Sequence, residues 1–455
     1  VVVHGVAIHD DTGLPKLDGP LCYDGLLYPV DAIAQDANGS LEIEDGSLTF
    51  CSPIEPSWVV TAENLRVDST TRIGEAWGAR IDVKGVPIAY LPWIQFPLDD
   101  QRKTGLLFPD VSSDTRGGVD VTVPIYMNLA PNYDATYSPR LIQDRGLLHR
   151  LNARLLSQRT GFWDITGAVL RNDDLQATPP NEDRWSINVQ HSSDPSDRLR
   201  THIDYSKVSD NRYLRDLENN TLSAQRQTAV LQHARLDWLA NNWLFGLEAQ
   251  QFQNITDDLS DNYKRLPQIS AIWRGNEMIG PLAPIIQLQA ANFDTDADKV
   301  TGQRLYQELG LTLPMTRDYG FLNTSVSYRA IDYRLKSPDS NQSWEASVDS
   351  WVTRIEGGLE FERQTTLFGT SFIQTLEPRV QYLYASYDDH SGIPDFDSAE
   401  LTFSYRQLFR ATRFSGYDRL ADANQLSLGV TSRLVDPKSG IERVSASIGQ
   451  VINFR

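Results

Sequence analysis

The chain has 455 residues, with 42 Lys or Arg against 60 Asp or Glu, so its formal net charge is −18. Such an acidic chain lacks the basic surface that nucleic-acid binding requires, which excludes a nucleic-acid partner. There is no run of about 18 apolar residues, which excludes a helical membrane span but not a membrane barrel, whose strands alternate apolar and polar side chains.

The first residues, VVVHGVAIH, contain no methionine, basic stretch or apolar core of a signal peptide. We therefore expect any signal peptide to lie upstream or to have been removed. The sequence holds only two cysteines, Cys22 and Cys51. So few cysteines in a chain of this size fit a compartment where free thiols are avoided or bridged.

Alternation of apolar and polar residues predicts β-strands at 40–50, 57–67 and 71–85. In the last segment the apolar residues of one parity are Ile73, Trp77, Ala79, Ile81 and Val83. The other parity carries Arg72, Arg80, Asp82 and Lys84. One apolar and one wet face indicate a sheet folded over a dry interior, and on pattern alone an ordinary β-sandwich core is the simplest interpretation.

The pattern changes after the charged run at 99–103. The strands beyond it are longer and richer in Tyr and Trp, and their links alternate between short ones, such as 194–197, and long polar ones, such as 209–225 and 386–399. This asymmetry is typical of an outer-membrane barrel, and at roughly 20 to 25 residues per strand and link we expect about 14 to 17 strands.

Two prolines lie inside segments that otherwise predict neighbouring strands, Pro109 and Pro124. Proline has no backbone N–H to donate to a strand ladder, so it is confined to strand edges, starts and bulges. The two prolines together predict that these neighbouring strands are joined by fewer backbone hydrogen bonds than usual, which gives a weak seam in the sheet. From the residues alone, Pro109 starting a strand and Pro124 marking a bulge is an equally available explanation.

Several long motifs in a fixed order resemble the lipopolysaccharide-assembly outer-membrane proteins. They are YLPW at 90–93, RKTGLLFP at 102–109, NLAPNYDAT at 128–136, QTLEPR at 374–379, GYDR at 416–419 and GVTSR at 429–433. The resemblance covers roughly residues 40–454 and implies an all-β fold: a periplasmic β-jellyroll over 1–102, followed over 103–455 by part of a large antiparallel transmembrane β-barrel. Members of the family have about 26 barrel strands, so we expect this chain to be an internal fragment.

The resemblance also implies a function without enzymatic activity or cofactor. Lipopolysaccharide would pass from a periplasmic jellyroll bridge protein into the apolar jellyroll, and then through a lateral opening into the outer membrane of a Gram-negative bacterium. A plug lipoprotein would sit inside the barrel, and outer-membrane lipids would surround it. The implied conduit lining consists of Val60, Ala62, Ile73, Trp77, Ala79, Ile81 and Val83.

Pro109 and Pro124 match the prolines of the family's first two barrel strands, which implies that they form one lip of the lateral gate, with the opposing strand expected beyond Arg455. Cys51 matches a jellyroll cysteine that forms a disulfide with a cysteine late in the barrel. No cysteine follows Cys51 here. Its partner therefore lies beyond Arg455 or is Cys22, and a free, buried Cys22 also remains open.

No other chemistry stands out. The seven histidines show no metal-ligand spacing, although His191 and His202 are expected near each other across a short hairpin. No nucleophile or nucleotide motif occurs, which argues against a barrel enzyme. Acidic residues at Asp388, Asp389, Asp395 and Asp397 fit either a solvated loop or a divalent-cation site. A passive porin is the alternative function, but a porin needs neither the jellyroll nor the paired prolines.

Overall fold

The computed structural model describes residues 6–9, 15–18, 21–23, 26–28, 32–35, 41–48, 58–68, 73–83, 85–97, 102–107, 109–114, 117–175, 182–218, 228–256, 263–275, 280–336, 343–367 and 369–454. Two compact units divide the chain, one of Val1–Gln190 with Ser206–Arg226 and the other of His191–Tyr205 with Gln227–Arg455. Within the described residues, no α-helix is both long and apolar enough to cross a bilayer.

The first unit begins with two short hairpins and a five-stranded sheet, all antiparallel. The hairpins pair β1 (Val6–His9) with β2 (Pro15–Asp18) and β3 (Leu21–Tyr23) with β4 (Leu26–Tyr28). The sheet is formed in chain order by β5 (Ala32–Gln35), β6 (Leu41–Leu48), β7 (Trp58–Asp68), β8 (Ile73–Val83) and β9 (Val86–Pro97).

A second antiparallel sheet begins after residue 104, and its hydrogen-bonded order follows the chain from β10 to β29. Its strands up to the unit boundary are β10 (Gly105–Leu106), β11 (Asp110–Asp114), β12 (Gly118–Thr122), β13 (Ile125–Ala130), β14 (Tyr133–Ile142), β15 (Gly146–Ser157), β16 (Gly161–Leu170), β17 (Arg184–Ser196) and β18 (Leu199–Val208). One short helix, α1 (Tyr213–Leu217), follows β18.

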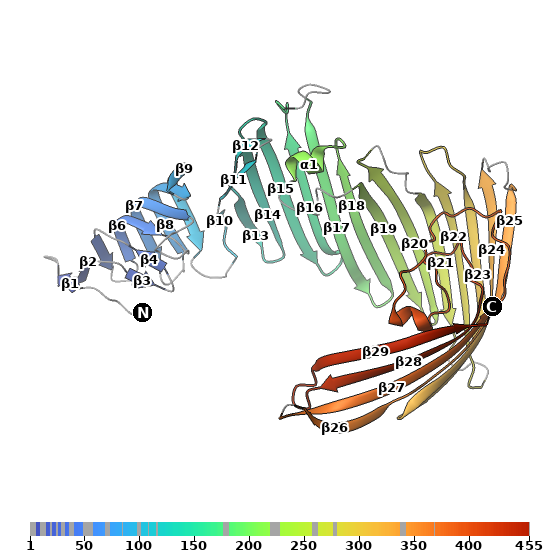
Figure 1. The fold of residues 1–455 in the computed structure, drawn as a ribbon. Helices are drawn as coiled ribbons and strands as arrows, with labels where there is room; N and C mark the ends of the chain where they lie inside the picture. Colours follow the sequence, from blue (N-terminus) through green and yellow to red (C-terminus); the bar gives the residue numbers. More distant parts are fainter. Residues whose placement is uncertain are drawn as a thin grey trace. The chain divides into compact units, whose positions relative to one another are not determined.

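The strands from β19 onward are mostly long and lie side by side in chain order (Figure 1). They are β19 (Ala229–Ala240), β20 (Trp243–Asn254), β21 (Lys264–Arg274), β22 (Ala283–Asp294), β23 (Thr301–Arg317), β24 (Gly320–Lys336), β25 (Glu345–Leu359), β26 (Phe361–Leu367), β27 (Thr370–Ala385), β28 (Ala423–Val435) and β29 (Glu442–Asn453). A 3-10 helix, η1 (Tyr405–Phe409), lies in the link between β27 and β28.

The all-β class and the large antiparallel sheet are as the sequence predicts. Twenty strands of this sheet are described, and they make 17 continuous runs because β10 with β11, β12 with β13 and β25 with β26 are each one interrupted strand. This number falls within the expected 14 to 17. Links also alternate in length, from two-residue turns at 241–242 and 318–319 to the long segment at 386–422.

The five-stranded sheet has one buried apolar face, but its alternation is interrupted. In β8, Ala76 is fully buried before Gly78, and Ala79 and Ile81 are buried after it. Trp77 is therefore not on the buried face, as unbroken alternation would place it, but is 38% exposed. The cause is local, because Gly78 has a φ of +59°, a left-handed conformation that shifts the alternation by one residue.

The same shift crosses neighbouring strands. In β7, Val60 and Ala62 are buried before the shift, and Leu65 and Val67 are buried after it. In β6, Asp45 has a φ of +49°. These positions are aligned by register, because Glu44 pairs with Asn64, Asn64 with Trp77, and Trp77 with Trp93. One line across β6, β7 and β8 therefore changes which side chains face inward, since Ile43 and Gly46 of β6 are both buried on either side of Asp45.

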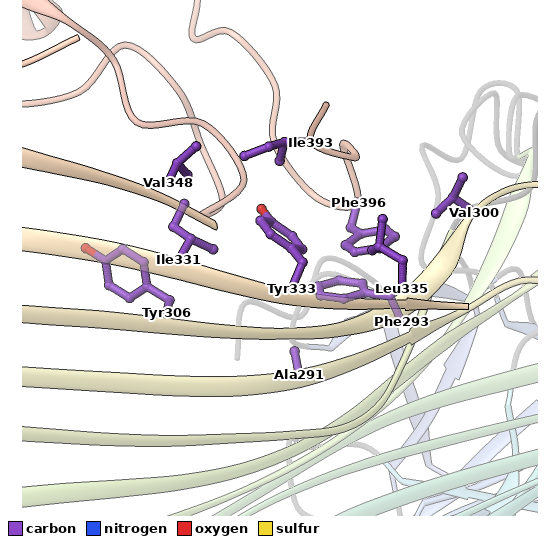
Figure 2. Close-up of a cluster of buried hydrophobic side chains, with 10 residues drawn as sticks. All are labelled: Ala291, Phe293, Val300, Tyr306, Ile331, Tyr333, Leu335, Val348, Ile393 and Phe396. Carbon is purple, nitrogen blue, oxygen red and sulfur yellow. The ribbon is translucent and has the colours of Figure 1, made fainter. Parts of the chain in front are cut away.

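The second unit has its own apolar core on one face of β22 to β25, where the segment 386–422 lies against the strands. Figure 2 shows Phe396 and Ile393 of this segment among Phe293, Tyr333 and other strand residues. The rings of Phe293 and Phe396 stack with centroids 4.5 Å apart. A long link thus folds back onto the sheet instead of extending into solvent.

The 3-10 helix η1 packs against two glycines that pair across β28 and β29, Gly429 and Gly449. A Cβ atom at Gly429 would lie 2.7 Å from the Tyr405 hydroxyl, and one at Gly449 would lie 2.4 Å from the Leu408 side chain. Only glycine therefore allows the helix to approach this closely.

The left-handed conformation of Gly78 predicts a stability effect. Gly78→Ala should destabilise the β7–β8 pair by about 1–2 kcal/mol, because a Cβ atom is disfavoured at this φ. Faster amide hydrogen exchange in 58–83 of the full-length protein would report the effect. Gly167→Ala is the matched control, since a Cβ atom there meets nothing within 4 Å. Unchanged exchange in the Gly78 variant would contradict this account of the shift.

Candidate functional site

The two prolines singled out by the sequence lie in one interruption of the sheet. Below it, Gly105 pairs with Tyr126 and Leu106 with Ile125. Above it, pairing resumes with Asp110 opposite Thr122. The described residues between these pairs, 107 and 109 on one strand and 123–124 on the other, form the proline break. We call β10 to β13 the first hairpin, with a proximal half (β10, β13) and a distal half (β11, β12).

Only part of the ladder survives in the proline break. The Leu107 amide donates to the Pro124 carbonyl at 2.8 Å. In a hydrogen-bonded antiparallel pair the two residues normally exchange two bonds, but Pro124 has no N–H with which to return the second. Pro109, at the start of β11, likewise has none to donate. The pair of Leu107 with Pro124 is therefore held by one hydrogen bond where two are usual.

A third proline, which the sequence interpretation missed, lies at the same level. Pro139 in β14 accepts a hydrogen bond from the Val123 amide at 3.1 Å. The signal was present in the sequence, because Pro109, Pro124 and Pro139 are equally spaced along the chain. Equal spacing along successive antiparallel strands of similar length brings such residues to one level of a sheet.

A buried carboxylate fixes the proximal half. Asp134 of β14 is 5% exposed. It accepts hydrogen bonds from Arg102 at 2.6 Å, from the Tyr126 hydroxyl at 2.9 Å and from Arg154 at 2.8 Å. Since these donors come from the residues before β10, from β13 and from β15, this Asp134 cluster joins the proximal half to its neighbours.

A second buried pair fixes the distal half. The Arg140 guanidinium of β14 binds Asp120 of β12 with its Nε at 2.9 Å and its Nη2 at 2.5 Å, and each residue is 7% exposed. Bidentate charge-assisted bonds of this kind are among the stronger ones in proteins. The proline break thus lies between two buried ion clusters.

The proposed conduit residues are only partly brought together. Val60, Ala62, Ala79 and Ile81 are all buried on neighbouring strands, and Val60 pairs directly with Ile81. Ile73 is half-buried. Trp77, as described above, is exposed. Val83 pairs with Trp58 and Val86 at the end of β8.

The cysteine and histidine expectations can be placed only in part. Cys51 lies outside the described residues, and Cys22 pairs with Leu27 in the backbone register of β3 and β4. The expected approach of His191 to His202 stays a prediction. The Nε2 of His191 lies 2.7 Å from the Thr201 hydroxyl, whereas the ring of His202 lies 5.9 Å from that of His233.

The acidic loop is mainly an anchor. Arg304 of β23 has a fully buried side chain, and its Nη1 lies 2.7 Å from Asp397 and 2.6 Å from Asp418. The Tyr333 hydroxyl also donates to Asp418, at 2.9 Å. No group of three or more potential metal ligands occurs among the residues that the structure describes. Asp397 is therefore an ion-pair partner, not a solvated loop carboxylate.

The two loop carboxylates respond oppositely to this environment. Burial raises the pKa of Asp397, but the hydrogen bonds and charge of Arg304 outweigh it and hold the pKa below its usual value. Burial raises the pKa of Asp418 above its usual value, and the charge of Asp397 adds to the rise. On acidification Asp418 should take up a proton first, while Asp397 keeps its pair with Arg304.

Arg304 should thus hold the 386–422 segment in place. Arg304→Met leaves two buried carboxylates unpaired, a change that typically costs about 3–5 kcal/mol. We expect rapid tryptic cleavage after Arg410 or Arg413 in the folded full-length protein. Arg334→Met is the control, because its side chain is 81% exposed and lies 4.0 Å from Glu345. Equal protease resistance in the two variants would argue against the anchor.

Comparison with known proteins adds independent information. The family model LptD, described as "LPS transport system D", matches residues 182–455. LPS-assembly protein LptD of Hahella chejuensis is 36% identical over 91% of this chain and 53% of its own length. The Pseudomonas aeruginosa protein of that name is 34% identical over 92% of this chain and 49% of its own length. The chain thus spans about half the length of these relatives.

Among solved structures, the P pilus usher (PapC) translocation pore aligns over 94% of this chain and 82% of that chain, with a TM-score of 0.34 and 11% identity. A similarity this low adds nothing to the description of the sheet, which rests on its own hydrogen bonds.

Proposed function

The chain belongs to the LptD family of the LPS transport system, and from this premise we propose that it forms part of a translocon that inserts lipopolysaccharide into the outer membrane of a Gram-negative bacterium. The family is one of transport and assembly proteins, not of enzymes. A passive porin is not favoured, because no porin is expected to match the sequence model of this family.

The proline break is the observation that carries the proposed mechanism. In the described sheet, the first strand pairs on one side only, through β10 with β13 and through β11 with β12. We propose that lipopolysaccharide leaves sideways at this strand. An exit must open repeatedly, and the bond missing at Pro124 lowers the cost of moving the first strand away from its neighbour, by roughly 1 kcal/mol.

The five-stranded sheet would supply the path to this exit. Its buried face on β7 and β8 is apolar, which suits acyl chains, whereas the polar faces suit water. We propose that residues 1–102 lie in the periplasm, belong to a β-jellyroll and receive lipopolysaccharide from a bridge protein of the same fold. The proposed conduit lining is Val60, Ala62, Ala79, Ile81 and Val83, whereas Ile73 and Trp77, which precede the shift at Gly78, alternate with the buried Ala76 and are left out of it.

Residues 103–455 would then belong to the membrane-spanning barrel, with outer-membrane lipids around it and a plug lipoprotein within it. The alternation of short and long links supports this orientation, because such barrels have short periplasmic turns and longer outer loops. The folded-back segment 386–422 would lie on the outer side. A disulfide from Cys51 to a cysteine elsewhere in the full-length protein belongs to the same proposal.

Restoring the backbone N–H groups that are missing at residues 109 and 124 should hinder the exit of lipopolysaccharide. Pro109→Ala and Pro124→Ala, combined in the full-length protein, should favour the closed seam by roughly fivefold for each bond regained. We expect slower arrival of lipopolysaccharide at the cell surface and greater sensitivity to large antibiotics. Pro314→Ala is the control, since Pro314 lies in the fully paired β23 opposite Asn323. An unchanged barrier in the double variant would count against the exit.

The conduit makes a separate prediction. A photo-crosslinking side chain placed at Val60, Ala62, Ala79 or Ile81 should form lipopolysaccharide adducts while the bridge protein is loaded. The strongest adducts are expected at Val60 and Ile81, which are paired and buried. Arg80 is the control position, because it alternates with Ile81 and its side chain is 57% exposed. No adducts, or equal adducts at Arg80, would refute the conduit.

A further inference from the structure

The α1 segment, residues 209–218, is fastened to three strands by three arginines. Arg184 of β17 binds both oxygens of Asp210 at 2.9 Å, and Arg150 of β15 binds Glu218. Arg140 of β14 donates to the Leu217 carbonyl at 2.5 Å. These contacts tie a link that follows β18 to strands much earlier in the chain.

Burial of two side chains also holds the α1 segment in place. Tyr213 and Leu217 of α1 are both 0% exposed. The Tyr213 hydroxyl accepts a hydrogen bond from Ser186 of β17 at 3.0 Å. A five-residue helix cannot be stable alone, so this seat and the arginines must hold it in place.

Of these three arginines, Arg140 is the one that also binds the first hairpin. With Nη1 it holds the end of α1, and with Nε and Nη2 it holds Asp120 of the first hairpin. Asp120 lies four residues before Pro124 in sequence, in β12 of the distal half. One buried guanidinium therefore connects the α1 segment to the hairpin that carries the proline break.

Apart from Arg140, the distal half is attached by a short ladder to β14 and by three hydrogen bonds near the turn that follows it. The amides of Gln143 and Asp144 donate to the carbonyls of Val119 and Gly117, and the Val119 amide donates to the Gln143 side chain. The described pairing of β12 with β14 consists of Asp120, Val121 and Thr122 opposite Ile142, Leu141 and Arg140. Below these pairs the ladder reaches the proline break. The planar guanidinium of Arg140 binds the Asp120 carboxylate through two parallel hydrogen bonds, which stabilises this short ladder and fixes the orientation of β12 on β14.

We propose that Arg140 is a positioning residue that couples the α1 segment to the first hairpin. While α1 is seated, Arg140 is held in place and keeps the distal half on β14. When α1 is displaced, Arg140 loses one of its two anchors and the distal half separates more readily. The inference rests on the proposed function in treating this hairpin as an exit, but the coupling itself is a property of the fold. Coupling of this kind is reciprocal, so loosening the hairpin should also loosen α1.

The test is amide hydrogen exchange in the full-length protein within its native complex, followed in 110–122 and in 209–218. Tyr213→Ala unseats α1 at a residue whose hydroxyl bonds β17. Although this hydroxyl does not bond the first hairpin, the substitution should make amide exchange in 110–122 about tenfold faster. This is the effect expected when one charge-assisted hydrogen bond is lost. Asp120→Asn should speed exchange in both segments. If Tyr213→Ala speeds exchange only in 209–218, the proposal fails.

Combining the two substitutions separates coupling from simple destabilisation. If the effect passes through Arg140, the double variant should exchange in 110–122 no faster than Asp120→Asn alone. Additive effects, or a uniform rise that includes β15 and β16, would overturn the proposal. Glu308→Gln, which removes an ion pair between β23 and β24, should leave 110–122 unchanged. Tyr213→Phe and Arg140→Lys serve as milder variants if the first ones do not fold, and each should give a smaller change of the same sign.

Exchange does not depend on lipid transport, so the two proposals can fail separately. Coupled exchange together with normal lipopolysaccharide export in the proline variants would leave Arg140 as a positioning residue and reject the exit. Uncoupled exchange together with impaired export would do the reverse.

Discussion

A backbone nitrogen that carries no hydrogen decides how the first hairpin behaves. The Pro124 carbonyl accepts a hydrogen bond from Leu107 of the first strand, but the Pro124 nitrogen has no hydrogen to donate in return. The rest of the hairpin compensates on either side, through the Asp134 cluster on the proximal half and the Arg140–Asp120 pair on the distal half. The strand pair is therefore held by buried ion pairs on both sides of the proline break and is weakest at the break itself.

Buried arginine is the recurring means of fixing loops to this sheet. Arg140, Arg184 and Arg304 each join strands to a segment distant in sequence, and each binds a carboxylate of another element. A guanidinium stays charged when buried and has five donors, so it can serve several acceptors at once. Carboxylates from long acidic links meet these arginines, and this gives part of the negative charge a structural role.

The sequence predicted the all-β class, the alternation of link lengths and the two prolines, because these depend on local period and on proline chemistry. It misplaced Trp77, because a left-handed glycine shifts the alternation and a strict period of two ignores it. It also overlooked Pro139, although the spacing was visible. The pair of Arg304 with Asp397 was beyond reach, since nothing local in the sequence brings residues so far apart into contact.

The central claim is that the first hairpin is weakest at the proline break. The most direct measurement is amide hydrogen exchange, resolved to single residues, in the full-length protein held in outer-membrane lipid. The account predicts that the amides of Leu107 and Val123 exchange several-fold faster than the paired amides of β14 and β15, although all lie in one sheet. Equal protection at Leu107, Val123 and those strands would contradict it.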